Sequence, residues 1–145
     1  MTSLLQVEDL RVSYGGVLGE LQAVDGVSLT VEPGEVVAVV GESGSGKSTL
    51  AMAVLGLLPG TGRIDGGRVV LDGQELTGLS EREMRAVRGH RIGLVPQDPT
   101  VSLNPVTRIG DQVAEVLRVH GLADRRTAEL EAIAPTTSTV DERAA

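Results

Sequence analysis

The feature that most constrains this chain is one glycine-rich segment, Gly41-Glu42-Ser43-Gly44-Ser45-Gly46-Lys47-Ser48. It fits the pattern G-x-x-x-x-G-K-[ST], in which consecutive backbone N–H groups curl around a phosphate group. Glycines keep side chains out of the way, and a helix that begins near Ser48 adds the positive end of its dipole. The segment predicts a phosphate-binding loop in which Lys47 reaches the β- and γ-phosphates and the Ser48 hydroxyl binds Mg²⁺.

The other members of the segment have different roles in this prediction. Glu42 and Ser43 occupy variable positions, so their backbones matter more than their side chains. Thr49 lies one residue further into the helix and can add a hydroxyl contact to a phosphate. Lys47 is the only lysine of the chain, and the pattern requires a lysine at that position. The alternative, a glycine-rich linker, does not account for the apolar strand before the segment and the helix after it.

The pattern around the loop predicts an α/β fold. Residues 36–40 are apolar on both faces and mostly β-branched, which is typical of a central strand in a covered parallel sheet. We expect this strand and a strand at 92–95 to lie in the mainly parallel core of a P-loop NTPase fold, beside an antiparallel β layer. The strands of that layer are expected at 4–14, 26–31 and 66–71. Helices are expected at 48–58, at 80–88, where Ser80 and Glu83 have the spacing of a capping box, and at 109–120.

Composition excludes several kinds of site. The 145 residues contain no cysteine, which rules out disulfides and thiol catalysis, and only two histidines, which argues against a histidine-rich metal site. A net charge of −7 argues against a nucleic-acid surface built on bulk positive charge. The apolar runs are too short for a membrane span, and no basic-then-apolar signal segment opens the chain. The sequence therefore predicts a cytoplasmic protein.

Residues on both sides of the loop resemble the ATP-binding subunits of ABC transporters. The resemblance rests on Ala23–Leu29 and Glu32–Glu35 before the loop and on Arg91–Pro99 after it. Ser102–Pro105 and Ile109–Glu115 look specifically like the dipeptide, oligopeptide and nickel importer branch. Because the resemblance ends near residue 125, residues 1–125 are expected to form a partial ABC-type ATP-binding domain.

The resemblance implies a function, partners and further site residues. It implies an ATP-binding subunit that couples ATP binding and hydrolysis to the import of a peptide or nickel, with ATP and Mg²⁺ at the loop. Tyr14 matches the aromatic residue that stacks on adenine, a contact worth about 1–3 kcal/mol in comparable cases. Gln97 matches the glutamine that meets Mg²⁺ and the attacking water, and it shares the catalytic role with Lys47. A packed tyrosine and a solvated glutamine are the plainer alternatives.

The implied partners are transmembrane permease subunits and a second ATP-binding subunit, and no nucleic acid is implied. With a permease, the subunit would lie at the inner face of the cell membrane. A P-loop kinase or GTPase is an alternative function of a different class. The base-recognition and switch motifs expected of those enzymes are not visible in the sequence.

Three parts of the family pattern are missing from the sequence: the LSGGQ-type signature, the apolar Walker B strand that ends in Asp-Glu, and the switch histidine. Leu79-Ser80-Glu81 lacks the glycines of a signature, and Asp141-Glu142 does not follow a buried strand. Residues 126–145 are therefore expected to be an aberrant, disordered tail after a truncation or frameshift. The alternative function is a non-catalytic remnant that binds ATP without turnover.

Overall fold

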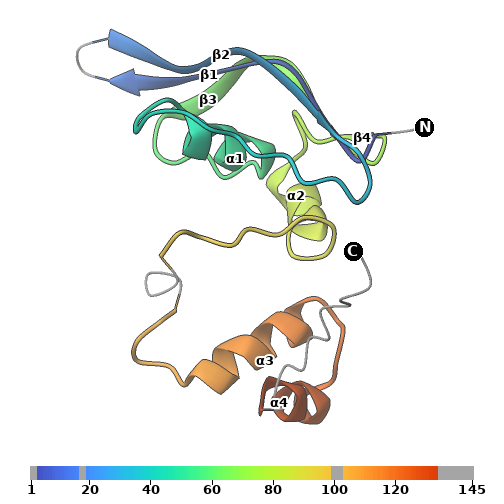
Figure 1. Cartoon of the computed structure of the whole chain (residues 1–145). Helices are drawn as coiled ribbons and strands as arrows, with labels where there is room; N and C mark the ends of the chain where they lie inside the picture. The colour runs from blue at the N-terminus through green and yellow to red at the C-terminus, as the bar shows by residue number, and fades with distance from the viewer. Residues whose placement is uncertain (1–2, 17–18, 99–102, 134–145) are drawn as a thin grey trace. The chain divides into compact units, whose positions relative to one another are not determined.

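The structure is a computed structural model, and it describes residues 3–16, 19–98 and 103–133. The chain divides into two compact units, Met1–Arg88 and Gly89–Ala145. Figure 1 shows the sheet with α1 and α2, which belong to the first unit, and α3 with α4, which belong to the second. The division at residue 88 differs from the predicted boundary at residue 125, which followed the extent of the resemblance rather than packing.

The first unit is built on a four-stranded antiparallel sheet in the order β2-β1-β3-β4. Strand β1 (Leu5–Gly16) pairs with β2 (Gly19–Val31) on one side and with β3 (Gly62–Leu71) on the other. The short strand β4 (Gln74–Glu75) pairs with β3 across a tight turn. The predicted antiparallel layer is confirmed, although β2 and β3 begin several residues earlier than the sequence pattern indicates.

Helix α1 (Lys47–Val54) packs on β1 and β2. Its buried residues Leu50, Ala53 and Val54 recur at helical spacing, so one face of the helix covers the sheet. They join an aliphatic core whose largest fully buried side chains are Leu10, Val7, Val12 and Val69. The helix ends before the predicted residue 58 because Gly56 takes φ +62 and the Leu57 amide turns back to the Met52 carbonyl, at 2.8 Å.

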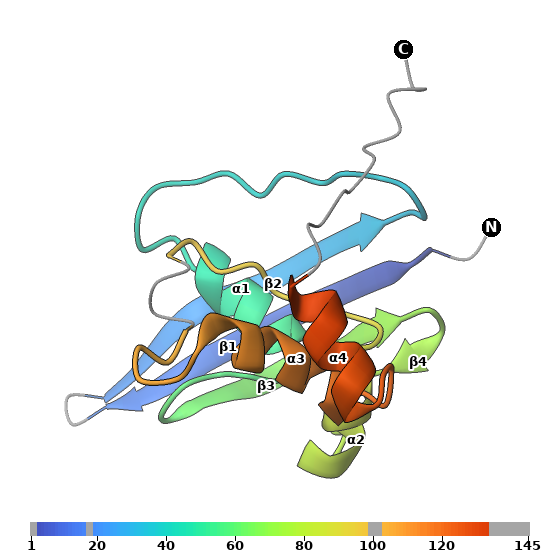
Figure 2. The ribbon, with the colours of Figure 1, turned by 90° about the horizontal axis from the view of Figure 1, so that it is seen from below.

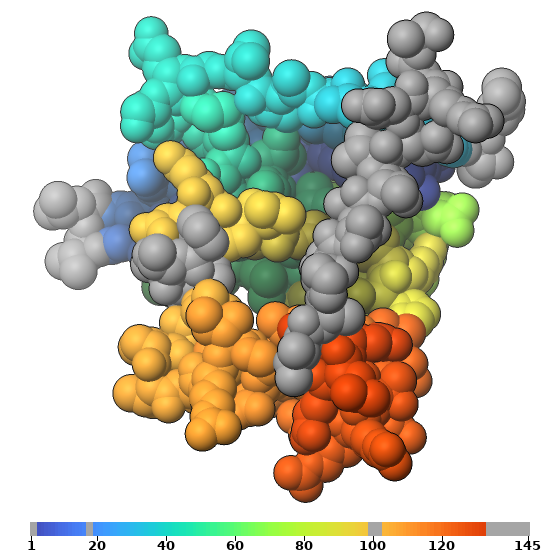
Figure 3. Space-filling view, turned by 60° about the horizontal axis from the view of Figure 1, so that its bottom comes forward, coloured from blue at the N-terminus to red at the C-terminus, as the bar shows by residue number. Residues whose placement is uncertain are grey.

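The segment 36–40, predicted to be a central strand, forms no strand. Val36 is 94% exposed and Val40 is 88% exposed; the segment lies at the surface in Figure 3, drawn in cyan. Figure 2 shows it within the long connection from β2 to α1. A strand that is apolar on both faces needs hydrogen-bonding neighbours, and the sheet of the described residues contains only antiparallel strands that pair elsewhere. The prediction of a parallel strand here is wrong for the described part of the chain.

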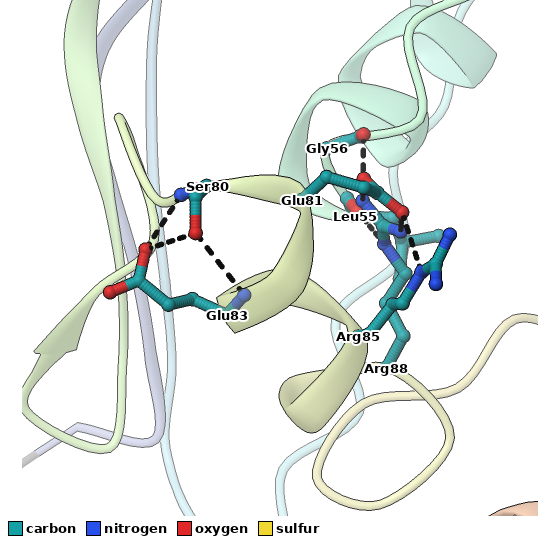
Figure 4. A network of polar contacts seen from close by, with 7 residues as sticks. All are labelled: Leu55, Gly56, Ser80, Glu81, Glu83, Arg85 and Arg88. Carbon is teal, nitrogen blue, oxygen red and sulfur yellow. Dashed lines mark hydrogen bonds and ion pairs between the residues drawn. The ribbon is translucent and has the colours of Figure 1, made fainter.

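Helix α2 (Glu81–Val87) begins with the predicted capping box. The Ser80 Oγ accepts from the Glu83 amide at 3.4 Å, and the Glu83 carboxylate accepts from the Ser80 amide at 2.8 Å (Figure 4). The hydroxyl and then the amide of Ser80 hold the pKa of Glu83 below its ordinary value. Met84 and Val87 are the buried residues of the helix.

The described residues of the second unit form two helices, α3 (Ile109–Val119) and α4 (Arg125–Ile133), which pack against each other. Ala114 of α3 and Ala128 of α4 are buried, and small side chains at these positions allow close approach. The sequence predicts α3, whereas it places residues 126–133 in a disordered tail. That expectation is wrong for 126–133 because Asp124 accepts the Thr127 amide at 2.8 Å and so starts a helix that buries Ala128. Residues 134–145 of the predicted tail lie outside the described residues.

The predicted strand at 92–95 is also absent from the described structure. Val95 is 93% exposed, and the Gly89 amide donates to the Ile92 carbonyl at 2.8 Å to make an isolated bridge. As with 36–40, an apolar sequence pattern defines a strand only when hydrogen-bonding neighbours are available. Neither strand of the predicted parallel core is therefore formed in the described residues.

Candidate phosphate-binding site

The predicted phosphate loop leads from the exposed segment 36–40 into the first turn of α1. The helix begins at Lys47, with Gly46 as its N-cap. Its first hydrogen bond runs from the Leu50 amide to the Gly46 carbonyl, at 2.8 Å. The amides of Lys47, Ser48 and Thr49 therefore have no acceptor inside the helix, and its first turn carries no acidic side chain. The positive end of α1 is open to an anion.

Glycines shape the loop in two ways. Gly44 and Gly46 take φ values of +82 and +89, which residues with a side chain rarely adopt. A Cβ on Gly46 would lie 2.2 Å from the carbonyl oxygen of Ala23, so the end of the loop rests directly on β2. A Cβ on Gly41 would lie 2.7 Å from Ser45 Oγ and 4.0 Å from Lys47 Nζ. The space that a side chain would fill at Gly41 is thus the inside of the loop.

The Lys47 ammonium group is folded into this loop. It donates to the carbonyl oxygens of Gly41 at 2.8 Å and Glu42 at 2.6 Å, and to Ser45 Oγ at 3.3 Å. These three acceptors match the three donors of an ammonium group. The positive charge is therefore held at the centre of the loop, where incoming phosphate oxygens can replace the neutral acceptors with charge-assisted hydrogen bonds.

A cavity of about 250 Å³ lies beside the loop. Its lining includes Val24 and Leu50 as apolar walls and Asp25, Ser45 and Lys47 as polar ones. Sites for whole small molecules usually measure about 300–1,000 Å³, so this cavity fits part of a nucleotide rather than all of it.

The residues present fit a magnesium ion that arrives with a phosphate. Mg²⁺ usually keeps several waters and takes only one or two protein oxygens together with phosphate oxygens. Ser48, in the first turn of α1, is exposed and offers one such hydroxyl oxygen. When bound, the ion would offset the negative charge of the phosphates.

Tyr14 lies in the same unit as the loop, near the end of β1. It pairs with Leu21 of β2 and with Gly62 of β3. A Cβ on Gly62 would lie 2.6 Å from Tyr14 Cε1, so the edge of the aromatic ring rests on the Gly62 backbone. The residue is half-buried.

Gln97 belongs to the second unit, in an irregular segment after the bridge at Ile92. Its side chain is exposed. The structure thus brings the loop residues and Tyr14 into one unit and leaves Gln97 in the other, so the contact predicted between Gln97 and the loop stays a prediction.

Sequence reasoning misses two long-range contacts, one at each end of α1. The Ala23 carbonyl touches Gly46, although the residues are far apart in sequence and alanine carries no chemical signal. Arg88 donates to the Leu55 carbonyl at the far end of α1, at 2.7 Å, across 33 positions. Only the three-dimensional structure reveals such pairs, because neither follows a local pattern.

A glycine-rich loop that runs into the first turn of a helix, with a lysine folded into it and a β-sheet beneath, defines a P-loop protein of the α/β class. The ABC transporter family model matches residues 24–144. The chain belongs to the ABC transporter family.

Curated relatives agree with this assignment. The chain is 42% identical over 134 residues to the oligopeptide transport ATP-binding protein OppD of Bacillus subtilis, covering 92% of this chain and 37% of that protein. It is 52% identical over 120 residues to OppD of Mycobacterium tuberculosis, covering 83% of this chain and 19% of that protein. The chain therefore spans much less than half of the length of these relatives.

A solved structure shows the same fold. It is the dimeric, post-hydrolysis state of an ATP-binding cassette bound to ADP and Pi. The match has a TM-score of 0.76 at 25% identity, and it covers 88% of this chain and 53% of that cassette. Within the part of the chain that the structure describes, no helix is both long enough and apolar enough to cross a membrane.

Proposed function

We propose that this chain supplies the ATP-binding part of an ABC transporter subunit that drives peptide import. The observation that carries the proposal is the Lys47 ammonium group held inside a glycine loop at the open N-terminus of α1. Family membership supports ATP as the ligand, and the names of the relatives support an oligopeptide rather than nickel as the transported solute.

Each site residue has a distinct role in this proposal. Lys47 exchanges its loop acceptors for oxygens of the β- and γ-phosphates, and the backbone around Gly44 and Gly46 wraps the phosphates. Ser48 supplies a hydroxyl oxygen to Mg²⁺, and Thr49 adds a hydroxyl contact to a phosphate. Glu42, Ser43 and Ser45 act mainly through their backbones.

Two residues outside the loop complete the proposed site. Tyr14 stacks on the adenine ring. Gln97 contacts Mg²⁺ and positions the attacking water. Because phosphoryl transfer depends on positioning and charge neutralisation, these contacts would place Lys47 and Gln97 in the catalytic step of ATP hydrolysis.

The proposal includes partners and a place of action. A second ATP-binding subunit is supported by the dimeric state of the solved cassette. The proposed partners at the inner face of the cell membrane are permease subunits. The whole subunit would change conformation when it binds and hydrolyses ATP, and this change would drive peptide movement through the permease.

Calorimetric titration of Mg-ATP into the full chain tests the proposal, with Lys47→Ala beside the wild type. Charge-assisted hydrogen bonds of this kind contribute about 1.5–3 kcal/mol each, so the variant should bind roughly ten- to a hundredfold more weakly. Arg82→Ala, on the exposed surface of α2, is the matched control for loss of one positive charge and should bind like the wild type. Equal affinity of the wild type and Lys47→Ala would refute the assignment of the loop.

A further inference from the structure

The C-terminal end of α1 is closed by an arginine that lies outside the helix. The Arg88 guanidinium donates to the Leu55 carbonyl through Nε at 2.7 Å and to the Gly56 carbonyl through Nη2 at 3.0 Å (Figure 4). Carbonyls at the end of a helix have no partners inside it. A fixed positive charge there satisfies them and also complements the negative end of the helix dipole.

Glu81 fixes the direction of this guanidinium group. Its two carboxylate oxygens accept from Nη1 and Nη2 of Arg88, at 2.9 Å and 3.1 Å (Figure 4). Two parallel hydrogen bonds hold the planar group in one orientation. The Arg88 side chain is only 17% exposed, whereas that of Glu81 is 61% exposed, so the arginine is packed and its carboxylate partner faces water. The hydrogen bond from Arg88 also holds the pKa of Glu81 below its ordinary value.

Packing joins α1 and α2 at the same point. A Cβ on Gly56 would lie 3.3 Å from Arg88 Nη2 and 3.3 Å from Met84 Cε, so the end of α1 rests against both side chains. Met84 is buried. The segment from α2 to Arg88 therefore holds the end of α1 through a buried apolar contact and two charge-assisted hydrogen bonds.

The other end of α1 carries the phosphate-binding residues. The helix has eight residues, which makes it about 12 Å long at 1.5 Å per residue. A helix of this length is unstable by itself in water, so its order depends on the contacts at its face and ends. Fraying or tilting at Leu55 would therefore change the directions of Lys47 and of the first amides of the helix.

We propose that Arg88 is a positioning residue for the phosphate-binding loop. By anchoring the far end of α1, it raises the fraction of molecules in which Lys47 and the open amides face a bound phosphate. The apparent dissociation constant rises in inverse proportion to that fraction. This inference rests on the proposed function, because it assumes that the loop binds a triphosphate, whereas the anchoring of α1 can be measured without any ligand.

Two neighbouring residues provide matched controls. Arg85 also contacts Glu81, at 3.4 Å, but its side chain is 78% exposed and this contact does not involve α1. Ser80→Ala removes the capping box at the start of α2, so it lowers stability without deleting an atom that contacts Arg88. The first control tests the loss of an arginine, and the second tests a general loss of stability.

The experiment measures Mg-ATP and tripolyphosphate binding to the full chain by calorimetry, at a temperature where circular dichroism shows each variant to be folded. Arg88→Met should weaken binding of both ligands by the same factor, at least about fivefold, the lower end of typical coupling between separate sites. Arg88→Lys, which keeps the charge but not the planar guanidinium group, should lose less affinity than Arg88→Met. Arg85→Met and Ser80→Ala should bind like the wild type.

Hydrogen exchange gives a readout that needs no ligand. Arg88→Met should speed exchange of the Leu55 and Leu57 amides at the end of α1, while amides of β1 keep their rates. If the wild type binds neither ligand, the proposed function fails, and the exchange rates alone then decide whether Arg88 anchors the helix.

Several results would overturn the inference. Unchanged affinity of Arg88→Met for both ligands would overturn it. An equal loss of affinity in Ser80→Ala would also overturn it, because lower overall stability would then explain the effect. If Arg88→Met does not fold, Arg88→Lys decides, and wild-type affinity in that variant overturns the proposal. Unchanged exchange at the end of α1 would contradict the anchoring itself.

Discussion

Replacing Gly46 with alanine should damage the phosphate-binding loop through a collision with β2. The new Cβ would lie 2.2 Å from the Ala23 carbonyl oxygen, about 1 Å closer than the usual limit of ~3.3 Å for carbon and carbonyl oxygen. The oxygen belongs to the backbone of a paired strand, so it cannot rotate away as a flexible side chain would. Either β2 or the start of α1 must move.

The magnitude follows from two separate costs. A left-handed φ of +89 costs an alanine about 1–2 kcal/mol. Forcing an extra carbon into a packed site typically costs about 1–3 kcal/mol more. Gly46→Ala should therefore lower the free energy of unfolding by about 2–5 kcal/mol, a large part of the stability of an ordinary domain.

Gly44→Ala is the matched control for this prediction. Gly44 has nearly the same backbone, φ +82, but a Cβ there meets nothing within 4 Å. The free energy of unfolding of Gly44→Ala should fall only by the backbone cost of about 1–2 kcal/mol. Urea unfolding followed by far-ultraviolet circular dichroism gives both values. If Gly46→Ala loses no more stability than Gly44→Ala, the contact between the loop and Ala23 does not exist.

Three further predictions concern the rest of the chain. Ser80→Ala should lower the free energy of unfolding by about 1 kcal/mol through loss of the capping box, and an unchanged urea midpoint would contradict this. The pKa values of Glu81 and Glu83 are held below 4.5 in the folded state, so the stabilisation they provide is present above pH 4.5 and is lost as the pH falls below it. Glu83→Gln should reduce the drop of the urea midpoint at acid pH, and a midpoint that depends on pH as in the wild type would contradict this prediction. Replacing the exposed Val36 and Val40 with threonine should reduce the binding of a hydrophobic dye and the self-association measured by light scattering, without lowering the urea midpoint. Unchanged dye binding would count against an apolar patch here.

Local sequence signals predicted the elements that depend on local chemistry. The glycine loop, the helix after it and the capping box of Ser80 and Glu83 all follow from residues within a few positions of one another. Asp124 caps α4 in a similar local way, since it accepts the Thr127 amide, but the sequence prediction did not use it.

Elements that depend on distant partners could not be predicted in this way. The valines at 36–40 have the pattern of a buried strand, yet strand formation requires hydrogen-bonding neighbours that no periodicity reveals. The contact of Arg88 with Leu55 joins two helices across 33 positions. Its chemistry is ordinary, but the pairing is set by how α1 and α2 pack.

The central claim is that Lys47 leaves its loop acceptors for the phosphates of a bound nucleotide. Because Lys47 is the only lysine of the chain, a protein labelled with ¹³C and ¹⁵N in lysine alone gives a single side-chain ammonium signal. The account predicts that Mg-ATP and tripolyphosphate shift this signal saturably as the contacts to Gly41 and Glu42 are exchanged for phosphate oxygens. A signal that stays unchanged while calorimetry shows Mg-ATP to be bound would contradict the account, because the phosphates would then lie somewhere other than this loop.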